Sequence, residues 1–222
     1  MKLTVVNGSP RGQKSNTSRL MTPFMKGYDS VSGNASQMFY LNHKLNEEKL
    51  ADIWHGSDII LLAFPLYVDA MPGQVKAFIE SLQGFQGSDH APALAFLVHS
   101  GFPEALHSRY VERYLVKLTR RLGCDYAGTI VKGGSEGMQL MPDKSIQPLL
   151  SKMEMLGASL GSNKVLDEKM LAEIAGMERI PGFMGLIFPL LAKMGVFNGM
   201  WNTQLKANQA YQDRYARPYQ PE

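Results

Sequence analysis

Short runs of apolar residues alternate with amphipathic segments over roughly the first 160 residues of the chain. Runs of this length, bounded by turn residues, are typical of strands that are buried on both faces of a parallel sheet. We therefore expect strands at 3–6, 37–41, 59–64, 93–98 and 126–131. The segments between them carry apolar residues at helical spacing. They predict helices at 16–28, 46–55, 73–82, 104–122 and 144–160.

This alternation of strand and helix predicts an α/β fold, a doubly wound parallel sheet with right-handed crossovers. In such sheets, ligands bind at the carboxyl ends of the strands, where the loops gather. The functional site is therefore expected just after Val6, Phe64, Val98 and Val131.

The pattern changes beyond about residue 165, where helical segments rich in Met, Gly and Pro follow without a further strand-like run. We therefore expect a sheet domain at 1–165. The remaining residues, 166–222, are expected to form a C-terminal helical extension that is not an independent domain.

The most apolar stretch of the chain lies in this extension, at 180–197, and Pro181, Pro189 and Lys193 interrupt it. A membrane-spanning helix needs about 20 predominantly apolar residues, so we expect no membrane span. Our interpretation is burial against the sheet domain or a second subunit. A cap over a substrate pocket and loose contact with a membrane are the alternatives.

Composition narrows the possible partners only modestly. The chain has 222 residues, of which 45% are hydrophobic, enough for one sizeable core. Its 23 basic and 20 acidic residues give a net charge of +3, which does not favour a nucleic-acid partner. The histidines at 43, 55, 90, 99 and 107 show no metal-binding spacing, so we expect no metal site.

The single cysteine and the N-terminal sequence indicate the cellular compartment of the protein. Cys124 has no second cysteine with which to form an internal disulfide, and one cysteine cannot supply the several ligands of an iron–sulfur or zinc site. The use of a single cysteine fits a protein of the reducing cytosol. The first apolar run stops at Asn7 and Gly8, far short of a secretory signal. We therefore expect a cytoplasmic protein.

The loop after the first expected strand, 7–17, combines glycine, hydroxyl and basic residues at the start of a helix, a natural anion site. It lacks the glycines of a G-x-G-x-x-G fingerprint. Gly8, Gly12, Lys14 and Ser15 also miss the register of a Walker A loop, G-x-x-x-x-G-K-[ST]. A loop that wraps a terminal phosphate with hydroxyls and an arginine remains, beside the plainer reading of a capped helix start.

The segments N-G-S-P-R at 7–11 and S-N-T at 15–17 resemble the flavin-phosphate loop of the NADPH-dependent FMN reductase family. The resemblance implies a flavodoxin-like doubly wound five-stranded parallel sheet, here with a C-terminal helical extension. It also implies that the phosphate of FMN is held by a set of polar residues: Ser9, Arg11, Ser15, Asn16 and Thr17.

Two further loops are similar to the same family. The stretch P-L-Y-V-D at 65–69 resembles the loop that borders the flavin ring, which implies contacts from Pro65, Leu66, Tyr67 and Val68, with Asp69 nearby or capping the next helix. The turn after the fourth strand implies contacts with the ring or the nicotinamide from His99, Ser100 and Gly101. Plain packing roles remain the alternative for Leu66, Tyr67 and His99.

The resemblance implies an FMN-dependent NAD(P)H oxidoreductase. NADPH or NADH would donate a hydride, and the electrons would pass by ping-pong kinetics to a quinone, a nitro or azo compound, a metal ion or free flavin. Because the flavin does the chemistry, no catalytic acid or base is expected. We also expect a homodimer. The alternative is a non-enzymatic flavodoxin-type electron carrier, which ranks second because such carriers are usually acidic and this chain is slightly basic.

Overall fold

The computed structural model describes residues 1–42, 46–195, 198–217 and 219. His43, one of the histidines without metal-binding spacing, lies outside the described residues. The chain divides into two units, Met1–Arg179 and Ile180–Glu222, and each is described by itself.

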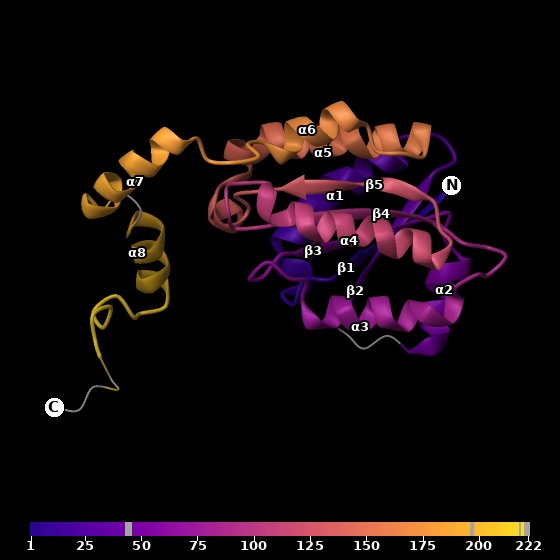
Figure 1. Ribbon diagram of the computed structural model, residues 1–222, viewed down its shortest axis with the longest axis horizontal. Helices are drawn as coiled ribbons and strands as arrows, with labels where there is room; N and C mark the ends of the chain where they lie inside the picture. Colours follow the sequence, from indigo (N-terminus) through magenta and orange to yellow (C-terminus); the bar gives the residue numbers. More distant parts are fainter. Residues whose placement is uncertain (43–45, 196–197, 218, 220–222) are drawn as a thin grey trace. The chain divides into compact units, whose positions relative to one another are not determined.

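Five parallel strands form the sheet of the first unit, in the order β2-β1-β3-β4-β5 (Figure 1). All five expected strands are confirmed, each within two residues at either end. They are β1 (Lys2–Asn7), β2 (Ala35–Tyr40), β3 (Ile59–Pro65), β4 (Ala93–His99) and β5 (Tyr126–Lys132). The central strand β3 is buried along its whole length, which explains its unbroken apolar sequence.

The five expected helices are also present. They are α1 (Asn16–Asp29), α2 (Glu47–His55), α3 (Gly73–Ser81), α4 (Leu106–Leu122) and α5 (Asp143–Asn163). Short 3-10 helices lie at Gly12–Lys14, Leu82–Phe85 and Glu136–Leu140.

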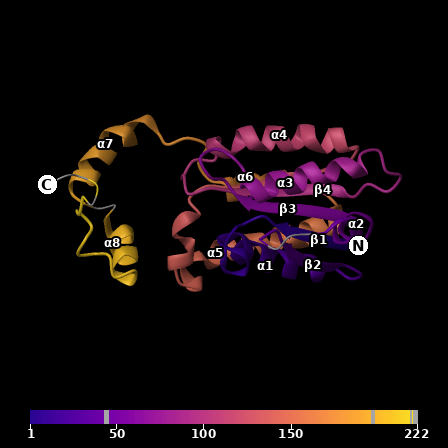
Figure 2. The same cartoon turned by 90° about the horizontal axis from the view of Figure 1, so that it is seen from below.

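The helices cover the two faces of the sheet and bury one apolar core on each side (Figure 2). Helices α1 and α5 pack on one face, and α2, α3 and α4 pack on the other. Successive strand residues point to opposite faces, so Leu61 of β3 enters the first core and Leu62 enters the second. This layering brings the loops after the strands together at one edge of the sheet.

Helices α1 and α5 approach each other closely because glycines face the partner backbone. A Cβ atom on Gly27 would lie 1.8 Å from the carbonyl oxygen of Glu154, and one on Gly157 would lie 1.9 Å from that of Phe24. A side chain at either position would therefore force the two helices apart.

The structure groups residues 166–179 with the first unit, whereas the sequence analysis expected the extension to begin at residue 166. Helix α6 (Glu168–Ala175) packs beside β5, and Leu166 and Ile174 are buried in the first core. The amide of Leu166 donates to the carbonyl of Ala127 at 2.8 Å, which satisfies part of the edge of β5. The sequence pattern missed this because α6 adds no strand and is short.

The second unit contains α7 (Gly182–Lys193) and α8 (Asn198–Ala207). Among the described residues, no helix combines the length and apolar character needed to cross a bilayer.

Candidate functional site

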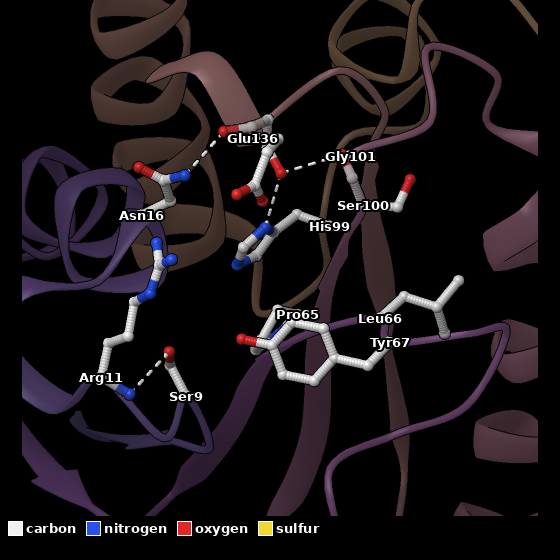
Figure 3. Close-up of a pocket in the computed structure, with 11 residues that line it drawn as sticks. Ser9, Arg11, Asn16, Pro65, Leu66, Tyr67, His99, Ser100, Gly101 and Glu136 are labelled. Carbon is white, nitrogen blue, oxygen red and sulfur yellow. Dashed lines mark hydrogen bonds between the residues drawn. The ribbon is translucent and has the colours of Figure 1, made fainter. Parts of the chain in front are cut away.

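A pocket opens at the carboxyl edge of the sheet, where the loops after β1, β3, β4 and β5 meet (Figure 3). Nine of the thirteen residues expected in the cofactor site line it. The full lining is Ser9, Arg11, Asn16, Pro65, Leu66, Tyr67, His99, Ser100, Gly101, Ser135 and Glu136.

The shape of the loop after β1 is set by Asn7, which is buried beneath it. Its side-chain oxygen accepts from the amide of Ser9 at 2.9 Å, and its side-chain nitrogen donates to the hydroxyl of Ser18 at 2.9 Å. Gly12 has φ = 55° and lies against Asn42. A Cβ atom on Gly12 would lie 2.6 Å from the side-chain nitrogen Nδ2 of Asn42. The loop is thus shaped by the protein itself before any ligand arrives.

Ser15 and Thr17 were expected to hold a phosphate, but neither lines the pocket. Ser15 caps α1: its hydroxyl accepts from the amide of Ser18 at 3.1 Å and donates to the carbonyl of Gly12 at 2.6 Å. The capped-helix interpretation therefore accounts for Ser15. Ser9, Arg11 and Asn16 supply the polar side chains of this part of the pocket.

Thr17 is fully buried, and its hydroxyl lies 2.8 Å from Nε2 of His99. The other ring nitrogen, Nδ1, lies 2.8 Å from the hydroxyl of Ser135, which donates to the carbonyl of Ser100 at 2.9 Å. Because the hydroxyl of Ser135 donates to Ser100, it can only accept from the ring of His99. The imidazole therefore donates from Nδ1–H to Ser135, and its Nε2 accepts from the hydroxyl of Thr17. We therefore assign His99 as the neutral Nδ1–H tautomer.

The burial of His99 favours the same neutral form. Desolvation by burial lowers its pKa from 6.5 to about 4. Asn16 adds a parallel link, since its side-chain nitrogen donates to the carbonyl of Ser135 at 2.6 Å. The start of α1, the end of β4 and the loop after β5 are thus held together by buried hydrogen bonds.

The loop after β3 brings three of its expected residues to the pocket, namely Pro65, Leu66 and Tyr67. The tyrosine side chain is 45% exposed, and it lies across the lower side of the pocket in Figure 3. It therefore offers a flat aromatic surface to a ligand.

Val68 and Asp69 do not line the pocket, because a tight turn carries them away from it. Tyr67 and Ala70 exchange backbone hydrogen bonds of 2.8 and 3.0 Å. The two residues between them have φ of 48° and 60°, as in the turns of tight hairpins. Val68 is 94% exposed at the tip of this turn.

Asp69 does not cap α3, whose N-cap position is Pro72 and has no side-chain hydrogen bond. Its carboxylate lies 3.2 Å from Nδ1 of His107, and Nε2 of that histidine lies 3.4 Å from Glu104. The imidazole also stacks on Phe102, with ring centroids 4.3 Å apart. His107 thus bridges the loop after β3 and the loop after β4.

Ser135 and Glu136 line the pocket but were not among the residues expected there. The glycines of the loop after β5 suggest a close approach of the backbone, and in the structure they approach other parts of the protein. A Cβ on Gly133 would lie 2.5 Å from the carbonyl of Pro103, and the amide of Gly134 donates to Phe102 at 2.7 Å. The position of this loop just after Val131, at the carboxyl edge of the sheet, was the signal that placed it at the site.

The pocket has two chemically different sides, which together suit a phosphorylated aromatic ligand. One side carries a guanidinium, a hydroxyl and an amide at the start of α1, where the helix dipole favours an anion. There, Oδ1 of Asn16 is buried with no hydrogen-bond partner among the described residues, leaving an acceptor for a ligand donor. The other side carries Pro65, Leu66 and Tyr67. Within the described residues, no group of three metal-binding side chains occurs.

Comparison with known proteins gave no match among family models or curated proteins, but several solved structures match. An NADH:FMN oxidoreductase (EMOB, apo form) is 15% identical, with a TM-score of 0.53 over 82% of this chain and 98% of that one. An NAD(P)H:quinone oxidoreductase from Methanothermobacter marburgensis is 16% identical, with a TM-score of 0.55 over 72% and 96%. An azoreductase from Bacillus anthracis is 15% identical, with a TM-score of 0.51 over 72% and 99%.

The chain has a flavodoxin-like fold. The strand order and these structural matches agree on this point. At identities of 15 to 16%, the likeness establishes the fold, and function has to be argued from the site.

Proposed function

We propose that this protein is an FMN-dependent NAD(P)H oxidoreductase of the FMN reductase family. The observation that carries the proposal is that a polar loop with Arg11 and a loop with Tyr67 meet at one pocket, after β1 and β3 of a flavodoxin-like sheet. The names of the matching structures, which include an NADH:FMN oxidoreductase and a quinone oxidoreductase, support the same class.

The polar side of the pocket would hold the phosphate. Arg11 supplies a charged group with several donors, and Ser9 adds a hydroxyl. Ser15 supports this side indirectly, because it caps α1 and so fixes where the first helical amides lie. The choice of FMN over FAD rests on the resemblance of residues 7–11 and 15–17 to the flavin-phosphate loop of the FMN reductase family.

The apolar side would hold the ring system, with Pro65, Leu66 and Tyr67 along it. When bound, the flavin would supply the redox chemistry, taking up a hydride from NAD(P)H and passing electrons to an acceptor. The protein's part is to bind, orient and shield. The buried hydrogen bonds through His99 keep the three loops in register and leave that residue neutral, so it does not serve as a proton donor near pH 7.

The acceptor belongs to the classes open to such a site: a quinone, a nitro or azo compound, a metal ion or free flavin. The expected homodimer and cytoplasmic location also remain parts of the proposal. Size-exclusion chromatography with light scattering and cell fractionation test these two parts separately from the chemistry.

The deciding experiment is the visible spectrum of the purified protein, taken before and after NADPH or NADH is added without oxygen. Flavin bands that bleach support the reductase. Chromatography of the released flavin distinguishes FMN from FAD. A protein that binds no added FMN contradicts the proposal, and one whose bound flavin stays oxidised with either nicotinamide is better explained as an electron carrier.

A further inference from the structure

Helix α7 of the second unit carries an apolar stripe on its surface. On α7, Phe183, Ile187, Leu190 and Met194 are 64, 44, 60 and 69% exposed. Their spacing of four, three and four residues places them on one face of the helix. Exposed apolar side chains that line up in this way mark an interaction surface.

Exposed aromatic residues and basic residues follow α7 in the same unit. Trp201 of α8 is 59% exposed, and Tyr215 is 80% exposed. The guanidinium of Arg214 lies 4.1 Å from the ring centre of Tyr211 and 4.8 Å from that of Tyr215. Tryptophan, tyrosine and basic residues beside an apolar face are typical of segments that lie in the headgroup region of a bilayer.

The length of α7 fits a helix that lies in the plane of a membrane. Its 12 residues span about 18 Å at 1.5 Å per residue, whereas the hydrocarbon core is about 30 Å thick. A helix of this length with an exposed apolar stripe can sink to the boundary between headgroups and acyl chains and bury the stripe there.

The charge of the unit selects an anionic surface over a second copy of the chain. Residues 180–222 contain four basic side chains, Lys193, Lys206, Arg214 and Arg217, and two acidic ones. A two-fold symmetric contact would set the same patch against itself and bring these cations toward one another. Anionic headgroups would attract them instead.

We propose that the second unit, through α7 and the neighbouring aromatic and basic residues, binds the surface of membranes that contain anionic lipids. The proposal does not depend on the flavin chemistry of the first unit. It gives the C-terminal extension a role of its own, that of a peripheral membrane contact.

Vesicle flotation of the full-length protein tests the proposal. Flotation with vesicles of phosphatidylcholine and phosphatidylglycerol is expected, with much weaker flotation on phosphatidylcholine alone. Leu190→Asp should lower the affinity for the anionic vesicles about tenfold or more, because one buried leucine contributes more than 1.4 kcal/mol. Met155→Asp is the matched control: Met155 is 56% exposed on α5 in the first unit, so this variant should bind normally.

Tryptophan emission provides a second readout, since the chain has two tryptophans. Trp54 is fully buried and donates to the carbonyl of His90 at 3.1 Å, so its emission should stay constant. Trp201 should shift to shorter wavelength on anionic vesicles, and Trp201→Phe should abolish the shift.

Three outcomes would overturn the proposal. The first is a wild-type protein that floats with neither vesicle or equally with both. The second is Leu190→Asp protein that floats like wild type. The third is a wild-type dimer that Leu190→Asp converts to a monomer in the absence of vesicle binding, which would assign the stripe to a second copy of the chain.

Discussion

The hydroxyl of Thr17 lies 2.8 Å from Nε2 of His99, and this buried contact joins the start of α1 to the end of β4. The two residues are 82 positions apart in sequence. Both were expected to touch a cofactor. His99 lines the pocket, whereas Thr17 does not and instead contacts His99. The contact therefore supports the pocket by fixing the relative positions of two of its loops.

Replacing His99 should change how stability depends on pH. Because burial lowers its pKa from 6.5 to about 4, the unfolded chain takes up a proton between these values and the folded chain does not. Stability should therefore be fully present above about pH 6.5 and fall as the pH drops toward 4, by up to roughly 3 kcal/mol. Urea unfolding across this range measures the effect.

The matched variant for that experiment is His99→Gln, which has no titrating ring. It should be less stable than wild type at pH 7 but lose less stability on acidification. A variant as acid-sensitive as wild type would remove His99 as the cause.

Arg11→Ala should weaken FMN binding by about 10- to 100-fold, the value of one charge-assisted contact with a phosphate. Fluorescence titration of the apoprotein with FMN measures this affinity, and thermal unfolding without FMN shows whether the fold is intact. Lys14→Ala is the control, because Lys14 belongs to the same loop but does not line the pocket. Equal affinities for the two variants would exclude Arg11 from the phosphate site.

Gly157→Ala should destabilise the first unit by about 3 kcal/mol or more, because the added methyl would lie 1.9 Å from the carbonyl oxygen of Phe24. Gly73→Ala in α3 is the comparison: its methyl would meet nothing within 4 Å, so the change should be neutral or slightly stabilising. Chemical denaturation of both variants gives the difference, and similar losses would contradict close packing between α1 and α5.

Val68→Asn should raise the stability of the protein by about 1 kcal/mol, because a β-branched residue at φ = 48° is strained and asparagine tolerates this region. The same change at Val165, which is 52% exposed and has no positive φ, should give no gain. Since Val68 does not line the pocket, FMN affinity should stay within about twofold of wild type. A large loss of affinity would restore the flavin contact implied by the family resemblance.

The sequence by itself determined the layered α/β architecture and the edge at which the pocket lies. Short apolar runs such as 59–64, bounded by turn residues and alternating with helical segments, are typical of buried parallel strands, and a parallel sheet gathers its carboxyl-end loops on one side. Local chemistry also identified Arg11 and Tyr67 as residues that reach this pocket.

Only the tertiary structure decided which polar groups within those loops remain available to a ligand. Ser15 and Thr17 carry hydroxyls like that of Ser9. The hydroxyl of Ser15, however, hydrogen-bonds to the backbone of Gly12 and Ser18, and that of Thr17 hydrogen-bonds to His99. The turn that moves Val68 out of the pocket likewise depends on backbone hydrogen bonds closed by Ala70. The partners of Ser15 and the turn at Val68 are local, and for Ser15 the capped-helix alternative already allowed for them. His99 lies on β4, 82 positions from Thr17, and a linear pattern does not encode which distant residue folding will bring within hydrogen-bond distance.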